Sequence, residues 1–331
     1  MNSGYPQDGV LLNLIDPRIR NNAVALRQQF RAADPFPHIV MDGFLDAAYC
    51  RDLIAAFPVF DGQNALNEYG EVGRKAVVRH LAGIGPAYAL FDRLLSSREF
   101  LSLVSEITGI PDLIYDADYI GGGTHENLGG QGLDAHVDFN YHPKTRAHRR
   151  LNLLLYLNPE WKAEWGGELE LHRNPWLPQE DRITSVPPIA NRCVLFETSE
   201  RSWHGFRNIV IPDGRSVSRR SIAVYFYTAD RPAAEVAPRH ATVYVHPSLP
   251  AHVRAGYTLQ EEDMATIQGM LERRDKHMRF LYEREKELSA TIDGLSSMLE
   301  RTTHSPTFRI ARMLTWPFRK LRGRRRPIGP T

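Results

Sequence analysis

The sequence predicts an α+β fold, in which a jelly roll or β-sandwich of short strands is braced by helices and followed by a long C-terminal helix. Three patterns lead to this prediction. Residues 1–111 mix helical patterns with one strand-like segment, residues 112–235 form short strand-like runs between turns, and residues 257–301 carry a heptad repeat. A basic amphipathic tail, residues 305–331, completes the predicted domain organisation.

The composition is that of a folded cytoplasmic protein. Of the 331 residues, 42% are hydrophobic and 24% are charged, which is typical of globular domains and not of disordered chains. No apolar run approaches the roughly 20 residues that span a bilayer, and the N-terminus does not have the pattern of a signal peptide. The two distant cysteines, Cys50 and Cys193, predict buried free thiols in a reducing compartment.

The segment before the strands is expected to support them. FPHIVMDGFL, residues 36–45, is typical of a strand, and AYCRDLIAAF, residues 48–57, is typical of a helix. A longer helix is predicted over residues 88–110, where apolar residues recur at helical spacing. Gly109 and Pro111 mark its end, because glycine favours the cap position and proline cannot continue a helix.

Short strands are predicted between residues 113 and 228, with glycine and proline turn signals between them. Seven or more such strands after a helical lead-in are typical of a jelly roll. The glycine-rich stretch GGGTHENLGGQG, residues 121–132, is expected to be either a mobile flap over the substrate or a plain connection. The strand candidates are LIYDADYI, LDAHVDF, RRLNLLLYLN, GELELH, RCVLFET, HGFRNIV and SIAVYFYT.

Residues 257–301 are predicted to form a coiled-coil helix. Seam residues are separated by alternating steps of three and four over five heptads, and the other faces are charged. A single amphipathic helix packed on the body is the alternative. Arg274 and Glu285 are polar breaks, of a kind that commonly fixes register or oligomer state, so we expect a homo-oligomer. The seam consists of Met264, Ile267, Leu271, Arg274, Met278, Leu281, Glu285, Leu288, Ile292, Leu295 and Leu299.

The C-terminal tail is strongly basic. The chain has a net charge of +2, and residues 305–331 carry eight cations and no acid, which leaves a net −6 for residues 1–304. Aromatic residues such as Trp316 and Phe318 alternate with these cations, a pattern suited to an anionic membrane surface. We therefore expect peripheral binding to the inner face of a membrane. A solvated tail is the alternative, and nucleic acid is the weaker competitor.

Three residues form a candidate metal site. In the stretch AHVDFNYH, His136 and Asp138 are two apart in a predicted strand, so their side chains share one face. His204 follows the later strand RCVLFET, 66 residues beyond Asp138. Two histidines and one carboxylate make the facial triad that holds non-haem Fe(II) and leaves coordination positions open. A structural zinc would instead fill four positions with protein ligands.

A co-substrate that chelates the metal and carries a second carboxylate requires a fixed cation. Arg219 and Ser221 are two apart on a predicted strand and therefore share a face. A guanidinium holds a carboxylate through paired, charge-assisted hydrogen bonds, and the hydroxyl can add a third. Arg220 and Arg215 are the competing partners for this carboxylate.

The order of these segments resembles the prolyl 4-hydroxylase-type branch of the 2-oxoglutarate/Fe(II) dioxygenases. His-x-Asp is followed by LLYLNPEWKAEWGGELELH, NRCVLFE, a further histidine and Arg-x-Ser, within about residues 112–229. The lead-in FPHIVMDGFLDAAYCRDLIAAFP is also similar to that of bacterial members. One departure is the interval between His204 and Arg219, which is longer than is usual in the family because IVIPDGRSV lengthens the turn.

The resemblance implies a double-stranded β-helix with Fe(II) held by His136, Asp138 and His204. It further implies that 2-oxoglutarate chelates the iron and that its C5 carboxylate lies on Arg219. The reaction would couple O₂ and decarboxylation of 2-oxoglutarate, to succinate and CO₂, with hydroxylation of an unactivated C–H bond. Ascorbate is a candidate auxiliary reductant. Relatives that halogenate carry a small residue at the carboxylate position, so Asp138 favours hydroxylation.

Supporting roles are predicted for five other residues. Tyr119 resembles the tyrosine that often touches the co-substrate in this family, and a core tyrosine is the alternative. Asn140, His142 and Asn152 are candidates for donors that orient the ligands, although His142 is expected to mark the loop after the strand. Glu168 is expected to be structural.

The substrate class is left open by the sequence. A prolyl residue, a free amino acid, and a sugar or other small metabolite are all compatible with the motifs. The alternative to an enzyme is a non-catalytic, membrane-associated scaffold built on a degenerate oxygenase fold. The intact triad together with Arg219 favours the enzyme.

Overall fold

A computed structural model describes residues 8–65, 73–212, 215, 217–308 and 310. The chain separates into two compact units, Met1–Ser248 and Leu249–Thr331. Most of the predicted basic tail lies outside the described residues, so its membrane role stays a prediction. Within the described ranges, no helix is both long and apolar enough to cross a membrane.

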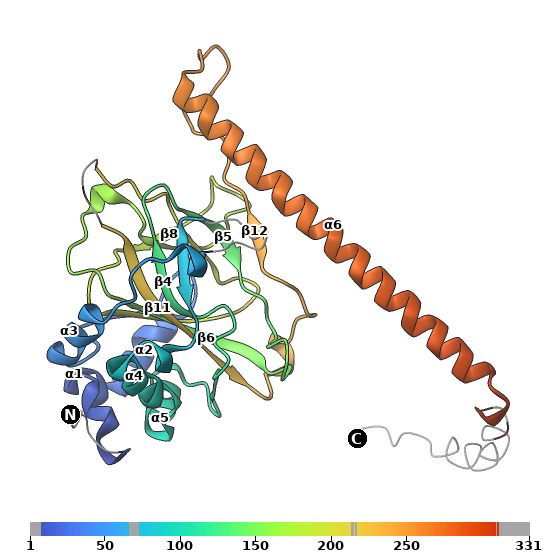
Figure 1. Ribbon diagram of the computed structural model, residues 1–331, viewed down its shortest axis with the longest axis horizontal. Coiled ribbons are helices and arrows are strands. Elements are labelled where there is room, and N and C mark those ends of the chain that lie inside the picture. The colour runs from blue at the N-terminus through green and yellow to red at the C-terminus, as the bar shows by residue number, and fades with distance from the viewer. Residues whose placement is uncertain (1–7, 66–72, 213–214, 216, 309, 311–331) are drawn as a thin grey trace, which may run out of the picture. The chain divides into compact units, whose positions relative to one another are not determined.

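The first unit contains two antiparallel sheets, which confirms the predicted α+β fold with a jelly-roll core (Figure 1). The larger sheet has the order β1-β9-β6-β11-β4-β2, with β3 paired to the end of β11, and the smaller has the order β12-β5-β10-β7-β8. The strands are β1 (His38–Asp42), β2 (Lys75–Val78), β3 (Ile114–Tyr115), β4 (Gly123–Asn127), β5 (Leu133–Val137), β6 (His148–Tyr156), β7 (Leu169–His172), β8 (Ile183–Val186), β9 (Arg192–Glu197), β10 (Trp203–Phe206), β11 (Arg219–Thr228) and β12 (Val243–Val245).

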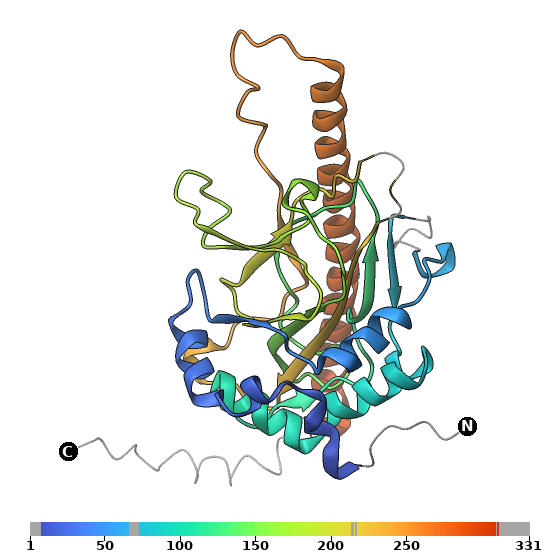
Figure 2. The same ribbon diagram turned by 90° about the vertical axis from the view of Figure 1, so that its left-hand side faces the viewer.

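Helices cover the outer face of the larger sheet, as Figures 1 and 2 show. Leu151, Leu153 and Leu155 of β6 pack with buried helical residues such as Phe91 and Phe100 in one core. Each such buried side chain stabilises the fold by about 1.5–3 kcal/mol. The helices are α1 (Pro17–Arg20), α2 (Ala23–Ala32), α3 (Ala47–Ala55), α4 (Pro86–Ser96) and α5 (Arg98–Thr108), with short 3₁₀ turns at Asp8–Leu14, Gly62–Ala65, Leu81–Gly83, Ala163–Trp165 and Ala233–Glu235.

A second, smaller core occupies part of the space between the two sheets. Tyr156 and Phe196 of the larger sheet meet Leu169 and Leu171 of the smaller sheet there. Alternation along β11 separates its two environments. Even-numbered residues such as Ile222 pack with the helices, whereas odd-numbered residues face the gap between the sheets. This alternation allows one strand to contribute side chains to a hydrophobic core on one face and to a polar cavity on the other.

The single helix predicted over residues 88–110 is two helices. Ser97 has an extended backbone (ψ 145°), and its Oγ accepts a hydrogen bond from Phe100 N at 3.2 Å, so it ends α4 and caps α5. The periodicity did not reveal this break because the apolar spacing continues across it. Gly109 caps α5 in the left-handed conformation, as expected.

Two strand-region predictions were wrong. The strand predicted over LIYDADYI is limited to β3, because the chain turns at Asp116–Ile120, where Tyr119 has a positive φ. The glycine-rich stretch 121–132 is neither a flap nor a plain connection, because it contains β4, which pairs with β2 and β11 inside the larger sheet. Gly123 suits this close pairing, since a Cβ there would lie 2.3 Å from the Val78 carbonyl oxygen.

The second unit contains α6 (Glu261–His304), the predicted long C-terminal helix. A capping box formed by Gln260 and Asp263 fixes its start. Asp263 also accepts hydrogen bonds from Tyr257 Oη at 2.9 Å and His252 Nε2 at 2.6 Å. The association of α6 with another helix stays a prediction.

Candidate metal and co-substrate site

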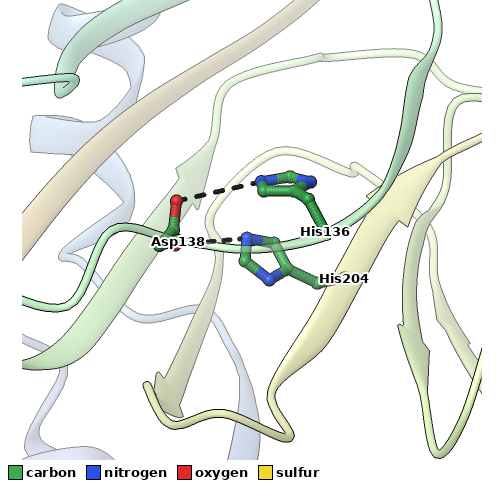
Figure 3. A group of neighbouring side chains, drawn as sticks. All are labelled: His136, Asp138 and His204. Carbon is green, nitrogen blue, oxygen red and sulfur yellow. Dashed lines mark ion pairs between the residues drawn. The ribbon is translucent and has the colours of Figure 1, made fainter. Parts of the chain in front are cut away.

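Two histidines face each other across neighbouring strands of the smaller sheet. The antiparallel register places His136 of β5 opposite His204 of β10, with ring centroids 4.2 Å apart. Asp138 follows β5 directly and turns to the same side, as its two-residue spacing from His136 predicts. Figure 3 shows the three side chains converging.

The ligand atoms of these residues are close enough to share one ion. His136 Nε2 lies 3.8 Å from Asp138 Oδ1, and His204 Nε2 lies 3.5 Å from Asp138 Oδ2. One ligand atom from each residue can be chosen so that all three lie within 4.8 Å of one another. Two atoms that each sit about 2 Å from one metal ion are at most about 4 Å apart, and the 3.8 Å and 3.5 Å separations lie within that limit.

The protonation states also suit metal binding. His136 Nδ1 donates to the Asp134 carbonyl at 3.0 Å and His204 Nδ1 donates to the Ser202 carbonyl at 2.9 Å. Because a carbonyl only accepts, each Nδ1 carries the proton and each Nε2 presents its lone pair to Asp138.

The local electrostatics keep the two imidazoles neutral and the carboxylate ionised. Burial, followed by the proximity of His204, lowers the pKa of His136 to about 3, and burial also lowers the pKa of His204. Burial alone would raise the pKa of Asp138, but Arg149 and the two imidazoles outweigh it and lower this pKa. Two neutral imidazoles and one carboxylate are therefore ready to bind a metal at neutral pH.

The donor set fits Fe(II). Two imidazoles and one carboxylate on one side of an ion form the facial triad of non-haem iron. Among the described residues, no fourth histidine, cysteine or carboxylate joins this group. A structural zinc would require such a fourth ligand, so the open positions favour a metal that binds exchangeable ligands.

Two further residues hold the Asp138 carboxylate. Arg149 Nη2 lies 3.0 Å from Asp138 Oδ2, and Asn152 Nδ2 donates to the same oxygen at 2.8 Å. Arg149 also donates to Asn152 Oδ1 at 2.9 Å, which fixes the amide orientation. Asn152 is thus the orienting donor predicted from the sequence. Arg149 was not predicted.

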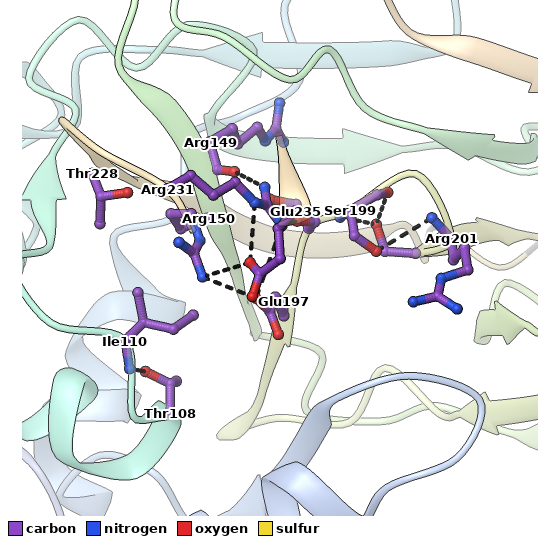
Figure 4. Close-up of polar contacts among 12 residues, drawn as sticks. Thr108, Ile110, Arg149, Arg150, Glu197, Ser199, Arg201, Thr228, Arg231 and Glu235 are labelled. Atoms are coloured by element: carbon purple, nitrogen blue, oxygen red, sulfur yellow. Dashed lines mark hydrogen bonds and ion pairs between the residues drawn. The ribbon is translucent and has the colours of Figure 1, made fainter. Parts of the chain in front are cut away.

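Arg149 itself is held rigidly. Its guanidinium lies over the Tyr225 ring at 3.6 Å and the Phe139 ring at 4.6 Å, and only 1% of the residue is exposed. Its carbonyl accepts from Arg231, which lies in the cluster of charged residues shown in Figure 4. In that cluster Arg150 pairs with two carboxylates, those of Glu197 (3.1 Å) and Glu235 (3.4 Å).

A cavity of about 230 Å³ extends from the triad between the two sheets. One water molecule needs only about 10–15 Å³ of such space, so this cavity is far larger than a site for a single water. Its polar lining residues are Lys75, His125, Asn127, His136, Asp138, Arg149, Asn152, His204, Arg219, Ser221, Tyr225, Thr242 and Tyr244.

Arg219 provides a buried positive charge in this cavity. Its Nε donates to the Gly167 carbonyl at 2.6 Å and its Nη2 donates to Tyr156 Oη at 3.1 Å. Only 4% of Arg219 is exposed, yet no described carboxylate pairs with it. A buried cation without a counter-ion is costly, so an anionic ligand would be stabilised here. Ser221 lines the same cavity, as predicted.

The strand register places further polar residues beside Arg219, in two rows across β2, β4 and β11. Lys75 of β2 lies opposite Asn127 of β4, which lies opposite Arg219 of β11. In the next row His125 lies opposite Ser221. Within the described chain, His125 Nε2 and Asn127 Oδ1 are buried and have no hydrogen-bond partner. The two cations, Lys75 and Arg219, are the groups here that would bind an anion, whereas an amide oxygen such as Asn127 Oδ1 can only accept a hydrogen bond.

The competing arginines point elsewhere. Arg220 turns to the opposite face of β11 and pairs with Glu126 at 3.2 Å. Arg215 lies 3.4 Å from Glu160 and does not line the cavity. The structure therefore brings Arg219, and neither competitor, to the triad's cavity.

Tyr119 does not lie at the site, contrary to the prediction that it touches the co-substrate. Its positive φ turns it away from the cavity, and its hydroxyl donates to Asp92 Oδ1 at 2.8 Å and contacts the Tyr115 hydroxyl. It is the buried core tyrosine that the alternative described.

Asn140 and His142 also have structural roles. Asn140 donates to the Pro238 carbonyl at 2.8 Å and accepts from His240 N at 3.0 Å, so it orients a loop and not a triad ligand. His142 lies in the loop after β5, where its Nε2 is 3.4 Å from Asp116 Oδ1. Glu168 follows the glycine turn before β7, consistent with a structural role.

Residues 123–227 match the family model described as the 2OG-Fe(II) oxygenase superfamily. This chain is also 34% identical over 80 residues to the prolyl 3-hydroxylase OGFOD1 of Mus musculus. That match covers 24% of this chain and 14% of the mouse protein, so the two share only a part of their lengths.

Solved structures with similar folds include two prolyl hydroxylases. A prolyl-4-hydroxylase from Pseudomonas putida is 19% identical with a TM-score of 0.44, and the match covers 62% of this chain and 99% of that chain. A prolyl hydroxylase from Trichoplax adhaerens, solved with a hypoxia inducible factor peptide fragment, is 18% identical with a TM-score of 0.44 and covers 63% and 90%.

Proposed function

We propose that this protein is a 2-oxoglutarate- and Fe(II)-dependent hydroxylase, and the match of residues 123–227 to the 2OG-Fe(II) oxygenase superfamily model supports this. The observation that carries the proposal is one cavity with two parts. At one end, two neutral imidazoles and a carboxylate converge, and elsewhere Arg219 and Lys75 lack described counter-ions. A scaffold without catalysis would have no need to preserve both parts.

The protein's own groups would do the following work. His136 and His204 would each bind Fe(II) through Nε2 while Nδ1 keeps its hydrogen bond to a backbone carbonyl. Asp138 would bind through Oδ1, because its Oδ2 is already held by Arg149 and Asn152. Fixing the carboxylate in this way leaves positions on the ion for co-substrate and O₂.

The other end of the cavity would bind the co-substrate. Arg219, Lys75 and Ser221 would hold the C5 carboxylate of 2-oxoglutarate, and its keto oxygen and C1 carboxylate would remain available to the metal. Bound Fe(II) would supply the activation of O₂. One oxygen atom would enter succinate as CO₂ leaves, and the other would form the hydroxyl group on the substrate carbon.

The proposal is tested by adding Fe(II) and then 2-oxoglutarate under anaerobic conditions. We expect a weak visible charge-transfer band that saturates with 2-oxoglutarate. Succinate release in air, screened with prolyl peptides, free amino acids and nucleotide sugars, would then identify the substrate class. A wild-type protein that binds Fe(II) but develops no band with 2-oxoglutarate would refute the proposal.

Replacing Arg219 with methionine is expected to weaken 2-oxoglutarate binding by about 10- to 100-fold, because a hydrogen-bonded charge is worth about 1.5–3 kcal/mol. The dissociation constant can be measured by titrating the charge-transfer band. Fe(II) binding should change little, since Arg219 does not contact the triad. Arg215→Met is the matched control, and equal loss in both variants would reject Arg219 as the anchor.

Lys75 predicts a pH dependence of co-substrate binding. Burial, followed by the charge of Arg219, lowers the pKa of Lys75 to about 8. Below this pKa the ammonium attracts the carboxylate, and above it the amine is neutral. We therefore expect 2-oxoglutarate affinity to fall about tenfold between about pH 7 and pH 9. In Lys75→Met the affinity should be weak and nearly constant over this range, and an unchanged slope would contradict the assignment.

A further inference from the structure

The seam of α6 is an exposed apolar surface. Its seam residues Leu271, Met278, Leu281, Leu288, Ile292, Leu295 and Leu299 are 49–64% exposed. In heptad terms, positions a are Met264, Leu271, Met278, Glu285, Ile292 and Leu299, and positions d are Ile267, Arg274, Leu281, Leu288 and Leu295. An apolar stripe that is exposed along a helix of this length marks an interaction surface on which a second helix can pack.

Two charges interrupt the seam at defined places. Arg274 occupies a d position and Glu285 an a position, and both are exposed and make no ion pair with any described residue. In a parallel, in-register pair of α6 helices, Arg274 would face its own copy, and so would Glu285. Like charges facing each other in a seam are destabilising.

An antiparallel pair removes this conflict, because each a residue then faces a d residue of the other helix. When Arg274 is placed opposite Glu285 of the partner subunit, the apolar seam residues from Met264 to Leu295 come into register, and Leu299 lies beyond the paired stretch. Met264 then faces Leu295 of the partner subunit, Ile267 faces Ile292 of the partner subunit, and Leu271 faces Leu288 of the partner subunit. Met278 faces Leu281 of the partner subunit.

Antiparallel registers shifted by one heptad do not pair Arg274 with Glu285 of the partner subunit. Sliding the helices by one heptad places Arg274 opposite Met278 or Ile292 of the partner subunit, and Glu285 opposite Ile267 or Leu281 of the partner subunit. Either slide buries unpaired charges against apolar side chains, which is costly. Charge complementarity thus selects one antiparallel register.

The residues at heptad positions e and g do not determine the orientation of the helix pair, so the seam residues decide it. Charges at positions e and g usually set the orientation of a coiled coil. Along α6, the formally charged residues at these positions from Asp263 to Thr303 are Asp263, Asp275 and Arg284. Arg284 already pairs with Glu287 on its own helix at 2.9 Å.

We propose that α6 binds α6 of a second copy of this chain as an antiparallel coiled coil, in the register that pairs Arg274 with Glu285 of the partner subunit. Eight apolar seam residues per helix, from Met264 to Leu295, supply the burial, and two symmetric ion pairs fix the register. This inference does not depend on the proposed enzymatic function.

Charge variants of the 331-residue chain test the register, with sedimentation velocity as the measurement. The wild type is expected to be a dimer. Glu285→Arg places two Arg–Arg contacts in the seam and should raise the dimer dissociation constant at least about 100-fold. The double variant R274E/E285R restores both pairs and should return this constant to within about fivefold of the wild type.

Glu283→Arg is the matched control, because it makes the same charge change on the outer face of α6 and should leave the dimer intact. A monomeric or higher-order wild type would overturn the proposal. The same holds if Glu285→Arg dimerises like the wild type, or if the double variant stays as weak as Glu285→Arg. Circular dichroism reports whether each variant keeps its helix.

Disulfide formation tests the orientation independently. One tagged chain carries Met264→Cys and an untagged chain carries Leu295→Cys, and the mixture is expected to give a cross-linked heterodimer. Leu295→Cys alone should not cross-link, because 31 residues at 1.5 Å each separate the two copies of position 295 by roughly 46 Å in the antiparallel pair. Efficient cross-linking of Leu295→Cys with itself would show a parallel pair and reject the proposal.

Discussion

Replacing His204 with alanine is expected to abolish the anaerobic charge-transfer band and to lower 2-oxoglutarate turnover at least about 1000-fold. Two of three protein ligands would remain, and a facial site with one imidazole and one carboxylate holds Fe(II) weakly. The band reports the assembled site of metal and co-substrate, so it separates loss of binding from loss of a later step. Both readouts should fall together.

His38→Ala is a closely matched control for this variant. His38 lies on β1, is 7% exposed, and its Nδ1 contacts the Phe36 carbonyl at 2.8 Å, the same local pattern that both His136 and His204 show. It does not line the cavity. Loss of the band in His38→Ala would therefore indicate a damaged fold, and retention of the band in His204→Ala would show that His204 is not a ligand.

The triad was predictable from the sequence because its geometry is local. His136 and Asp138 need only the two-residue period of a strand, and His204 follows a strongly apolar strand. The residues beside Arg219 on neighbouring strands were not predictable in this way. Lys75 and Asn127 come from strands whose pairing is set by tertiary register, and β4 begins in a run of glycines that is typical of a loop.

Arg149 was missed for a different physical reason. Strict alternation along β6 would place Arg149 on the same face as Leu151, toward the helices. The pairing of β6 with β11 instead shifts register between Phe226 and Tyr227, where an extra residue is accommodated. This bulge turns Arg149 to the cavity, beside Asn152. A pattern of period two cannot reveal a position that depends on a bulge.

Arg149→Met is expected to produce the second large effect, a loss of about 3–5 kcal/mol of stability in the metal-free protein. The reason is that Asp138 is buried and Arg149 is its ion-pair partner at 3.0 Å. Methionine keeps most of the apolar stem between Phe139 and Tyr225 but leaves the carboxylate with Asn152 and neutral imidazoles. Thermal unfolding of the metal-free variant measures this loss.

Adding a divalent ion should restore much of the stability that Arg149→Met loses. The ion supplies a positive charge beside Asp138 in place of the missing guanidinium. Arg149 also repels the ion in the wild type, so removing it should tighten Co(II) binding about tenfold or more. The rise in Tm on adding Co(II) should therefore be larger in Arg149→Met than in the wild type. Arg150→Met removes the neighbouring buried cation, whose partners Glu197 and Glu235 are not triad residues. Arg150→Met should lower stability without enlarging the rise in Tm on adding Co(II). An equal rise in Tm in the wild type, Arg149→Met and Arg150→Met would show that Arg149 does not act on the metal site.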